Sequence, residues 1–220
     1  MALIKPTASK FSKSKKWKKS LKKFVPVRVP EYRPESKFTT KLTDEASPQF
    51  TSFDGYVENL LFFNALGDSN ADRNGNRINA VSVNVRGSVT IGSDYKPTLG
   101  KVMLIQDTNS VFGVQPTMNE IFSQNPQMIG TSIACQAYLN RSNLGRFKVL
   151  ATKQFSLTTL KPEFQYNIYK KVNDIVTWTT DAEPLINKNH YYLVIITNQP
   201  DTLVTKSQIF NASRVKYYDS

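Results

Sequence analysis

The residues best suited to bind a ligand are the lysines crowded into the first thirty positions of the chain. This segment has ten basic side chains, and the first acidic residue is Glu31. A dense block of ammonium groups attracts a polyanion because each neutralised phosphate releases counterions, and this attraction ignores base sequence and weakens with salt. We therefore predict a nucleic-acid-binding segment over residues 1–30, whose basic residues are Lys5, Lys10, Lys13, Lys15, Lys16, Lys18, Lys19, Lys22, Lys23 and Arg28.

The net positive charge of the chain lies almost entirely in this segment. The whole sequence has 29 basic and 17 acidic residues, a net charge of +12. The 190 residues after position 30 therefore have 19 basic and 17 acidic groups, a net charge of only +2. The basic block repels itself and contains too little apolar surface to offset the entropy of ordering. We expect it to be a disordered arm in the absence of a partner.

Two other roles for the arm follow from its composition. A lysine-rich block is also typical of a nuclear localisation signal, which is compatible with nucleic-acid binding. Trp17, Leu21 and Phe24 have the spacing of one helical face and so suggest a membrane-surface helix. Three apolar anchors bind a membrane weakly, and Pro26 and Pro30 would end such a helix. A solvated tail without a partner is the remaining alternative, and nucleic-acid binding is the favoured one.

The rest of the chain has little that could perform catalysis. It contains one histidine, His190, and one cysteine, Cys135. His190 begins an apolar stretch, so we expect a structural histidine, and we expect Cys135 to be a small buried residue. The sequence has no Gly-rich phosphate loop, zinc-ligand spacing or serine-nucleophile motif. We predict that the protein is not an enzyme. A single cysteine also excludes a disulfide framework within the chain.

The chain beyond the arm has the pattern of an all-β protein. Residues 31–50 are polar and contain proline, which indicates a tether, and residues 51–220 are rich in aromatic and β-branched residues. Thr117 and Glu120 have the spacing of a capping box, so we expect one short helix there. Residues 58–66 fit a strand or a helical turn. We predict an antiparallel sandwich or barrel of about eight strands, with candidate strands at 49–57, 78–91, 101–107, 147–157, 164–172, 175–179, 190–197 and 208–218.

No membrane-spanning segment or secretory signal is expected. The longest apolar run near the C-terminus, Tyr191 to Ile196, is far shorter than the roughly 20 residues that a spanning helix needs. The lysine-rich N-terminus lacks the apolar segment of a signal peptide.

The order of several motifs resembles that of a known protein family. The motifs are GDSNADRNGNRI from Gly67, a long strand ending in Val85-Arg86-Gly87, KVMLIQD, Pro-Thr before a short helix, GRFKVLATKQFSL, and a final Tyr218-Asp219-Ser220. Together with the lysine-rich arm, this order resembles the capsid proteins of the satellite tobacco necrosis virus type. It is also similar to capsid proteins of many small circular Rep-encoding single-stranded DNA viruses. The resemblance covers residues 60–220 by pattern.

The resemblance implies an eight-stranded antiparallel jelly roll, with residues 51–220 as the shell domain. It further implies that sixty copies build a T=1 icosahedral shell, with the arm pointing inward onto a genome of RNA or single-stranded DNA. The protein would then be located in the virion, and in the host nucleus during assembly if the arm also directs import. Its partners would be copies of itself, the genome and a host attachment factor that the sequence does not name.

The resemblance also suggests roles for residues outside the lysine set. Some satellite-virus capsids bind calcium between subunits, and Asp68 and Asp219 match the positions of their carboxylates. Calcium suits such a role because it accepts several oxygen ligands from neighbouring chains. Trp17 and Phe24 would either stack on unpaired bases or dock the arm on the inner wall of the shell.

Viral capsid protein is therefore the leading functional hypothesis from the sequence. The alternative is a cellular β-sandwich binding module with a basic nucleic-acid-binding tail. A free DNA-binding regulator fits less well, because the arm offers only lysine and one arginine and no structured element to read base edges.

Overall fold

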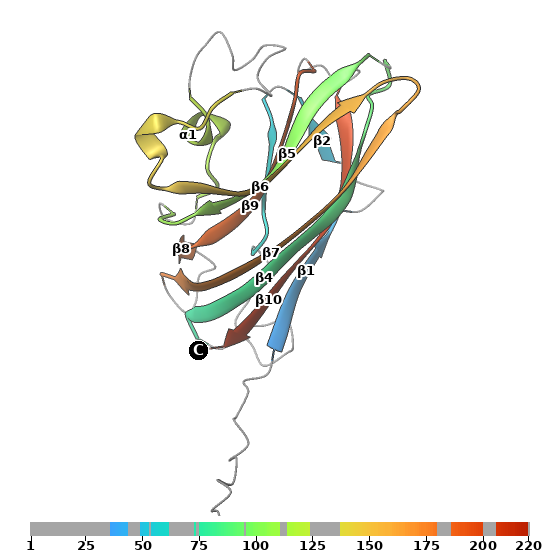
Figure 1. Cartoon of the computed structure of the whole chain (residues 1–220). Coiled ribbons are helices and arrows are strands. Elements are labelled where there is room, and N and C mark those ends of the chain that lie inside the picture. The colour runs from blue at the N-terminus through green and yellow to red at the C-terminus, as the bar shows by residue number, and fades with distance from the viewer. Residues whose placement is uncertain are drawn as a thin grey trace, which may run out of the picture. The chain divides into compact units, whose positions relative to one another are not determined.

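The computed structural model describes a body built from two antiparallel β-sheets (Figure 1). The chain divides into two units, Met1–Arg33 and Pro34–Ser220, and all the described residues belong to the second. These residues are 36–43, 49–52, 54–61, 73, 75–94, 96–110, 114–123, 137–179, 186–199 and 206–219.

The first sheet, called sheet A here, has the strand order β1-β10-β4-β7-β8, and β2 also pairs with β10. The second, called sheet B, has the order β3-β9-β5-β6. Sheet A is formed by β1 (Ser36–Leu42), β2 (Gln49–Thr51), β4 (Arg77–Thr90), β7 (Glu163–Trp178), β8 (Ile186–Lys188) and β10 (Ser207–Asp219). Sheet B is formed by β3 (Tyr56–Asn59), β5 (Thr98–Asp107), β6 (Phe147–Leu157) and β9 (His190–Thr197).

The strand pairs are nested along the chain. With the short strands β2 and β8 set aside, four strands remain in each sheet. Of these eight, the first pairs with the last (β1 with β10), the second with the seventh (β3 with β9), the third with the sixth (β4 with β7) and the fourth with the fifth (β5 with β6). The antiparallel sandwich that the sequence predicts is therefore confirmed.

The core between the sheets explains the clear alternation of the β4 sequence. Val83, Val85 and Val89 are completely buried and face sheet B. The register with β7 shifts between Ala80 and Ser82, so the buried side chains before this irregularity are Ile78 and Ala80. Strict alternation along 78–91 would place Val81 on the core side with Val83. The irregularity instead moves the core-facing position from 81 to 80 and leaves Val81 half-buried.

A second apolar cluster covers the opposite face of sheet B. Met103 and Ile105 of β5 and Tyr192, Val194 and Ile196 of β9 contact a segment that contains the only α-helix of the described residues. That helix, α1 (Met118–Ile121), contributes Ile121, and Phe122 follows it. Because both faces of β9 are covered, every residue of that strand is buried. Its continuous apolar sequence is what such a strand requires.

The predicted capping box begins α1. The Thr117 hydroxyl accepts a hydrogen bond from the Glu120 backbone N–H at 3.3 Å, and the Glu120 carboxylate accepts one from the Thr117 N–H at 2.7 Å. Arg146 then ties this helix to sheet B. Its guanidinium lies 2.8 Å from the fully buried Asp107 carboxylate and 3.3 Å from Glu120.

The structure corrects the predicted tether and strand boundaries. Residues 31–50 were predicted to be a tether, yet β1 lies within that range and pairs along its whole length with β10. The strand predicted at 49–57 is two short strands, β2 and β3, whereas those at 164–172 and 175–179 are one strand, β7. Asn173 interrupts the alternation of β7 because its φ is 55°. No helix within the described ranges has the length and apolarity needed to cross a membrane.

Candidate functional site

The predicted nucleic-acid-binding residues, from Lys5 to Arg28 and including Trp17, lie outside the described residues. Their role stays a prediction. Cys135 and Asp68 also lie outside them. The candidate site built here is therefore on the body.

The outer face of sheet A, which points away from sheet B, has a strongly basic set of side chains. Strand alternation fixes which residues point outward, because their neighbours Val83, Val85, Ile168 and Val215 are buried in the core. The only acidic residue that points outward on these strands is Glu163, within the described part of the sheet. We use the name basic face for the outer surface of β4, β7 and β10, whose five outward-pointing basic residues are Arg77 and Arg86 of β4, Lys171 of β7, and Arg214 and Lys216 of β10. Lys188 of the edge strand β8 is not part of this set.

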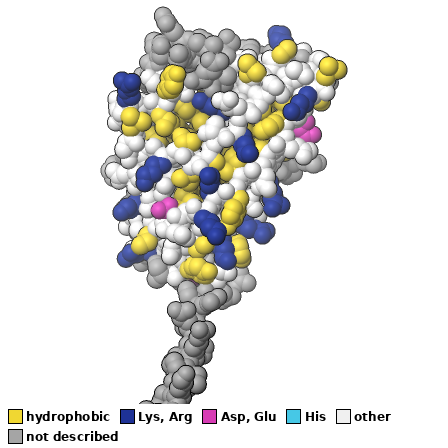
Figure 2. Space-filling view, viewed as in Figure 1, with side chains coloured by type: hydrophobic (Ala, Val, Ile, Leu, Met, Phe, Trp, Pro, Cys, Tyr) yellow, Lys and Arg dark blue, Asp and Glu magenta, His cyan; other side chains and the backbone are white. Residues whose placement is uncertain are grey.

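Figure 2 shows basic side chains interleaved with apolar ones, and few acidic ones, on the face in view. Strands β7, β4, β10 and β1 lie side by side in that order, as the register also shows. Among the described residues, the ion pairs involve Lys37, Lys41, Lys96 and Arg146, and none of the five residues of the basic face. Their charges are therefore available to a ligand.

Aromatic rings lie among these charges. Phe38 of β1 is 41% exposed and pairs across the strands with Lys216. The Arg214 guanidinium lies 5.5 Å from the centre of the Phe38 ring, and Lys216 Nζ lies 5.8 Å from the centres of both the Phe38 and Tyr218 rings. These distances fit cation–π contacts, which hold both the cation and the ring at the surface.

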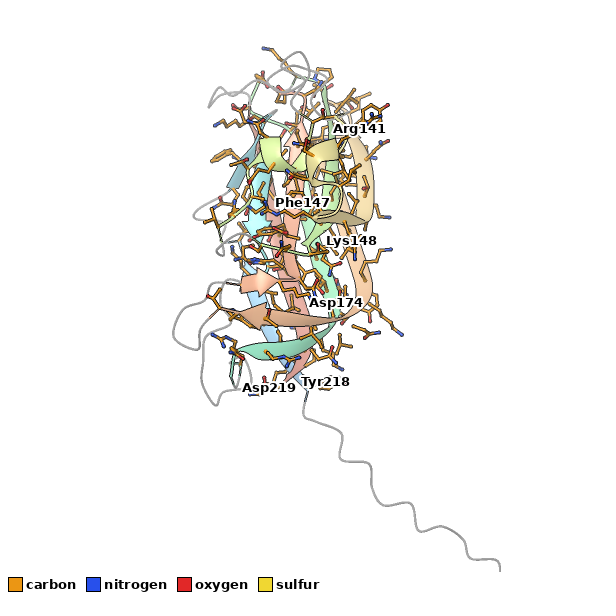
Figure 3. All side chains as sticks on the ribbon, turned by 90° about the vertical axis from the view of Figure 1, so that its left-hand side faces the viewer. Arg141, Phe147, Lys148, Asp174, Tyr218 and Asp219 are labelled. Carbon is orange, nitrogen blue, oxygen red and sulfur yellow. The ribbon has the colours of Figure 1, made fainter. Side chains whose placement is uncertain are left out.

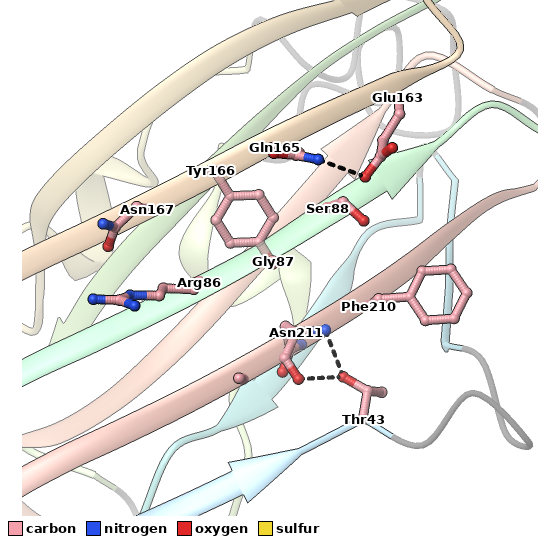
Figure 4. Close-up of a pocket in the computed structure, with 11 residues that line it drawn as sticks. Thr43, Arg86, Gly87, Ser88, Glu163, Gln165, Tyr166, Asn167, Phe210 and Asn211 are labelled. Atoms are coloured by element: carbon pink, nitrogen blue, oxygen red, sulfur yellow. Dashed lines mark hydrogen bonds between the residues drawn. The ribbon is translucent and has the colours of Figure 1, made fainter.

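Two hollows open on the basic face and share Arg86 and Ala212. The larger has a volume of about 500 Å³ and is lined by Arg86, Ser88, Gln165, Asn167 and Phe210 among others. The smaller has a volume of about 240 Å³ and is lined by Thr40, Leu42, Asn84, Arg86 and Arg214 among others. Figure 4 shows the larger hollow, with Arg86 and Asn167 on neighbouring strands and Gln165 bonded to Glu163 at the far end.

The space in the larger hollow depends on Gly87. A Cβ atom at this position would collide with the carbonyl oxygen of Phe210 and approach the Tyr166 hydroxyl to 2.7 Å. In the smaller hollow, the buried side-chain oxygen of Asn84 accepts no hydrogen bond from the described residues. Arg214 donates from Nε to the Thr40 hydroxyl at 3.4 Å. Its other nitrogens, together with Arg86 and the Asn84 amide oxygen, keep hydrogen-bonding capacity for an occupant.

Behind the basic face, a buried polar cluster joins the two sheets. Glu58 of β3 is 3% exposed, and its carboxylate lies 2.9 Å from Lys41 Nζ and 2.7 Å from the Asn211 side-chain nitrogen. Burial, together with the charge of Glu58, raises the pKa of Tyr56 well above its usual value. The ion pair offsets the cost of burying the carboxylate, so this cluster is structural.

His190 is also structural, as the sequence predicts. It is 1% exposed, and its Nε2 lies 2.5 Å from the Asn59 side-chain oxygen while its Nδ1 lies 3.0 Å from the Tyr192 hydroxyl. Asn59 Oδ1 also accepts the Leu61 N–H, so Nε2 donates and Nδ1 accepts. Burial lowers the pKa of His190 to about 3, which keeps the ring neutral.

The second predicted calcium ligand, Asp219, forms an ion pair. Its carboxylate lies 2.7 Å from Lys37 Nζ, at the end of sheet A where Figure 3 labels Tyr218 and Asp219. An ammonium group that neutralises a carboxylate competes with a metal ion for it. No group of three or more histidine, cysteine or acidic residues within the described ranges is arranged to hold a metal ion.

Comparison with known protein families gives no match, and no curated protein matches the sequence.

The basic face is not predicted from the sequence, because its five residues are spread over three strands between positions 77 and 216. The one available signal is in β10, where Arg214 and Lys216 alternate with the apolar Val215 and Tyr217.

Proposed function

We propose that the protein is a viral capsid subunit that assembles into a sixty-subunit T=1 shell and packages a nucleic-acid genome through its lysine-rich arm. The observation that carries the proposal is the separation of charge. Ten basic residues and no acid occupy positions 1–30, whereas the following 190 residues have a net charge of only +2. A near-neutral body can pack closely against copies of itself, because its subunits repel each other little.

The strand order supports the same proposal. Nested pairing, in which the first strand lies beside the last and the fourth beside the fifth, is what an eight-stranded jelly roll predicts. A jelly roll is common in viral capsids but also occurs in lectins, so the fold alone does not choose between these functions. The charged arm is what favours a capsid.

The charge of the arms suits a small genome. Sixty arms with ten basic residues each supply 60 × 10 = 600 positive charges. This would neutralise a large part of a genome on the order of one thousand nucleotides, each with one phosphate charge. Binding through lysine is expected to be independent of sequence, since phosphate contacts carry no base information.

Replacing the nine lysines of residues 1–23 with glutamine tests the arm. We expect particles of this variant to contain little nucleic acid, because the counterion-release term is lost. The measurement is the amount of nuclease-protected nucleic acid per particle, and digestion of the extracted nucleic acid with DNase or RNase then identifies the genome type. The control replaces the same nine lysines with arginine, which keeps the charge and should preserve packaging. Full-length genome inside the glutamine particles would contradict the role of the arm.

A further inference from the structure

We infer that the basic face of sheet A is a second binding site, for single-stranded nucleic acid, centred on Arg86 and Arg214. The inference rests on the proposed function and extends nucleic-acid binding from the arm to the body. If it holds, the basic face points toward the packaged genome in an assembled particle.

The distribution of charge over the body is the first argument. Residues 31–220 have 19 basic and 17 acidic groups. Five of these basic groups and one of the acids lie on the basic face, a local charge of +4. The other described residues have 13 basic and 7 acidic groups, whereas the basic face has five and one. A surface on which positive charge is concentrated in this way attracts a polyanion to one side.

The geometry at Arg86 is the second argument. Arg86 lines both hollows and Arg214 lines the smaller one, so two arginines border a space of about 240 Å³. Guanidinium groups bind phosphate oxygens with paired, charge-assisted hydrogen bonds. The adjoining space of about 500 Å³ is bordered by Gln165, Asn167 and Phe210, which offer amides for base edges and a ring for stacking. Phosphate contacts and base contacts thus lie next to each other.

The exposed rings favour a single strand over a duplex. Phe38 and Tyr218 lie at the surface beside Arg214 and Lys216, and Tyr169 of β7 is 55% exposed. Aromatic side chains stack on bases only where the bases are unpaired, and each such stack is worth about 1–3 kcal/mol. Basic and aromatic residues that alternate across a sheet are the arrangement found where proteins bind single strands without sequence preference.

A second copy of the chain is a poorer occupant for this face. A two-fold contact would bring the same patch of each copy together, and the five basic residues would then face their equivalents. Like charges at close range are unfavourable, and Glu163 is the only described acid on the face to offset them. A polyanion instead gains free energy from each of these charges.

The test measures binding of the full-length protein to a fluorescent oligothymidine of about twenty nucleotides at several salt concentrations. We expect the double variant Arg86→Gln/Arg214→Gln to bind more weakly. The slope of log K against log salt should also fall by about 1.4, since each phosphate contact to a single strand contributes about 0.7. The variant Arg86→Lys/Arg214→Lys keeps the charge and should keep the slope.

The matched control is Lys148→Gln/Lys153→Gln. Both lysines are exposed on β6 of sheet B, away from the basic face, and their replacement removes the same two charges. We expect this variant to keep the wild-type slope. An equal fall in slope for both double variants would overturn the inference, because only the net charge would then matter. An unchanged slope in Arg86→Gln/Arg214→Gln would overturn it as well.

Ultraviolet cross-linking should attach the oligonucleotide to peptides that contain Phe38, Phe210 or Tyr218. Cross-links confined to residues 1–30 would contradict a site on the body.

Two further measurements separate this inference from other outcomes. Electron microscopy of the wild-type protein detects shells independently of the salt dependence of binding. If shells form but the slope of Arg86→Gln/Arg214→Gln equals that of the wild type, only the inference about the basic face is wrong. If the slope falls in this variant but the wild type forms no shells, only the capsid proposal is wrong. Vesicles that contain an anionic lipid serve as competitors. If loss of Arg86 and Arg214 weakens binding to the vesicles but not to the oligonucleotide, the face binds a membrane and the inference is wrong.

Discussion

At the scale of single residues, His190 is the clearest case of a buried polar group that is fully paired. It is the only histidine of the chain, and both of its ring nitrogens have hydrogen-bond partners. Burial lowers its pKa to about 3, compared with about 6.5 in an unfolded chain. The folded state therefore binds no proton at His190 over a pH range in which the unfolded state does.

This difference predicts a loss of stability in mild acid. Above about pH 6.5 the ring is neutral in both states, and the full stability is present. As the pH falls toward 3, only the unfolded state takes up the proton, so the free energy of unfolding declines. Between about pH 7.5 and pH 5 we expect a loss of about 2 kcal/mol from His190, measured by urea denaturation.

The variant His190→Gln keeps a polar side chain of similar reach but does not titrate. Its free energy of unfolding should change less than that of the wild type between the same two pH values. The carboxylates are the same in both proteins, so their contribution cancels in the comparison. If the variant and the wild type lose equal stability, His190 is not held neutral in the folded protein.

At the scale of elements, the close approach of β4 and β10 depends on the absence of a side chain at Gly87. A Cβ atom there would meet the backbone of Phe210, and a strand backbone cannot move aside without breaking its ladder. The same approach places Arg86 and Arg214 on adjacent strands of the basic face. The fold and the proposed binding surface therefore depend on the same contact.

The substitution Gly87→Ala should lower the free energy of unfolding by about 1–3 kcal/mol, the usual cost of forcing extra volume into a packed region. The measurement is a denaturant titration. Gly145→Ala is the matched control, since no atom lies within 4 Å of a Cβ built at Gly145. Its effect should stay within about 0.5 kcal/mol. Equal effects of the two substitutions would show that crowding at β10 is unimportant.

The sequence predicts the long strands whose apolar residues face the core, but it misses β1 and the three-residue β8. Strands β6 and β9 have the predicted bounds because their apolar patterns begin and end with the strand. β1 escapes prediction because its inward-facing side chains are Lys37, Thr39 and Lys41, whereas the apolar Phe38 and Leu42 point outward and are exposed. The inward polar residues are stabilised by ion pairs with Asp219 and Glu58, which no local pattern reveals.

The candidate site is predictable from the sequence only where charge is contiguous. The arm is visible because its ten basic residues adjoin each other in the sequence. The basic face is assembled from β4, β7 and β10 by strand pairing, so its residues lie far apart in the sequence. Finding it requires the register of three strands, and register depends on the whole sheet.

At the scale of the whole molecule, the charge pattern separates two tasks. In the proposed capsid, the body, whose residues after position 30 have a charge of +2, would supply a β-sandwich with surfaces for contact between copies. The arm would supply charge for a polyanion. A cellular β-sandwich module with a basic tail would share this pattern but would have no reason to form a closed assembly.

Electron microscopy of the purified full-length protein, in low salt with added nucleic acid, therefore tests the central proposal most directly. We predict small closed shells of uniform diameter, because a T=1 particle contains a fixed number of identical subunits. Monomers that persist under these conditions would contradict the capsid proposal and favour the binding module.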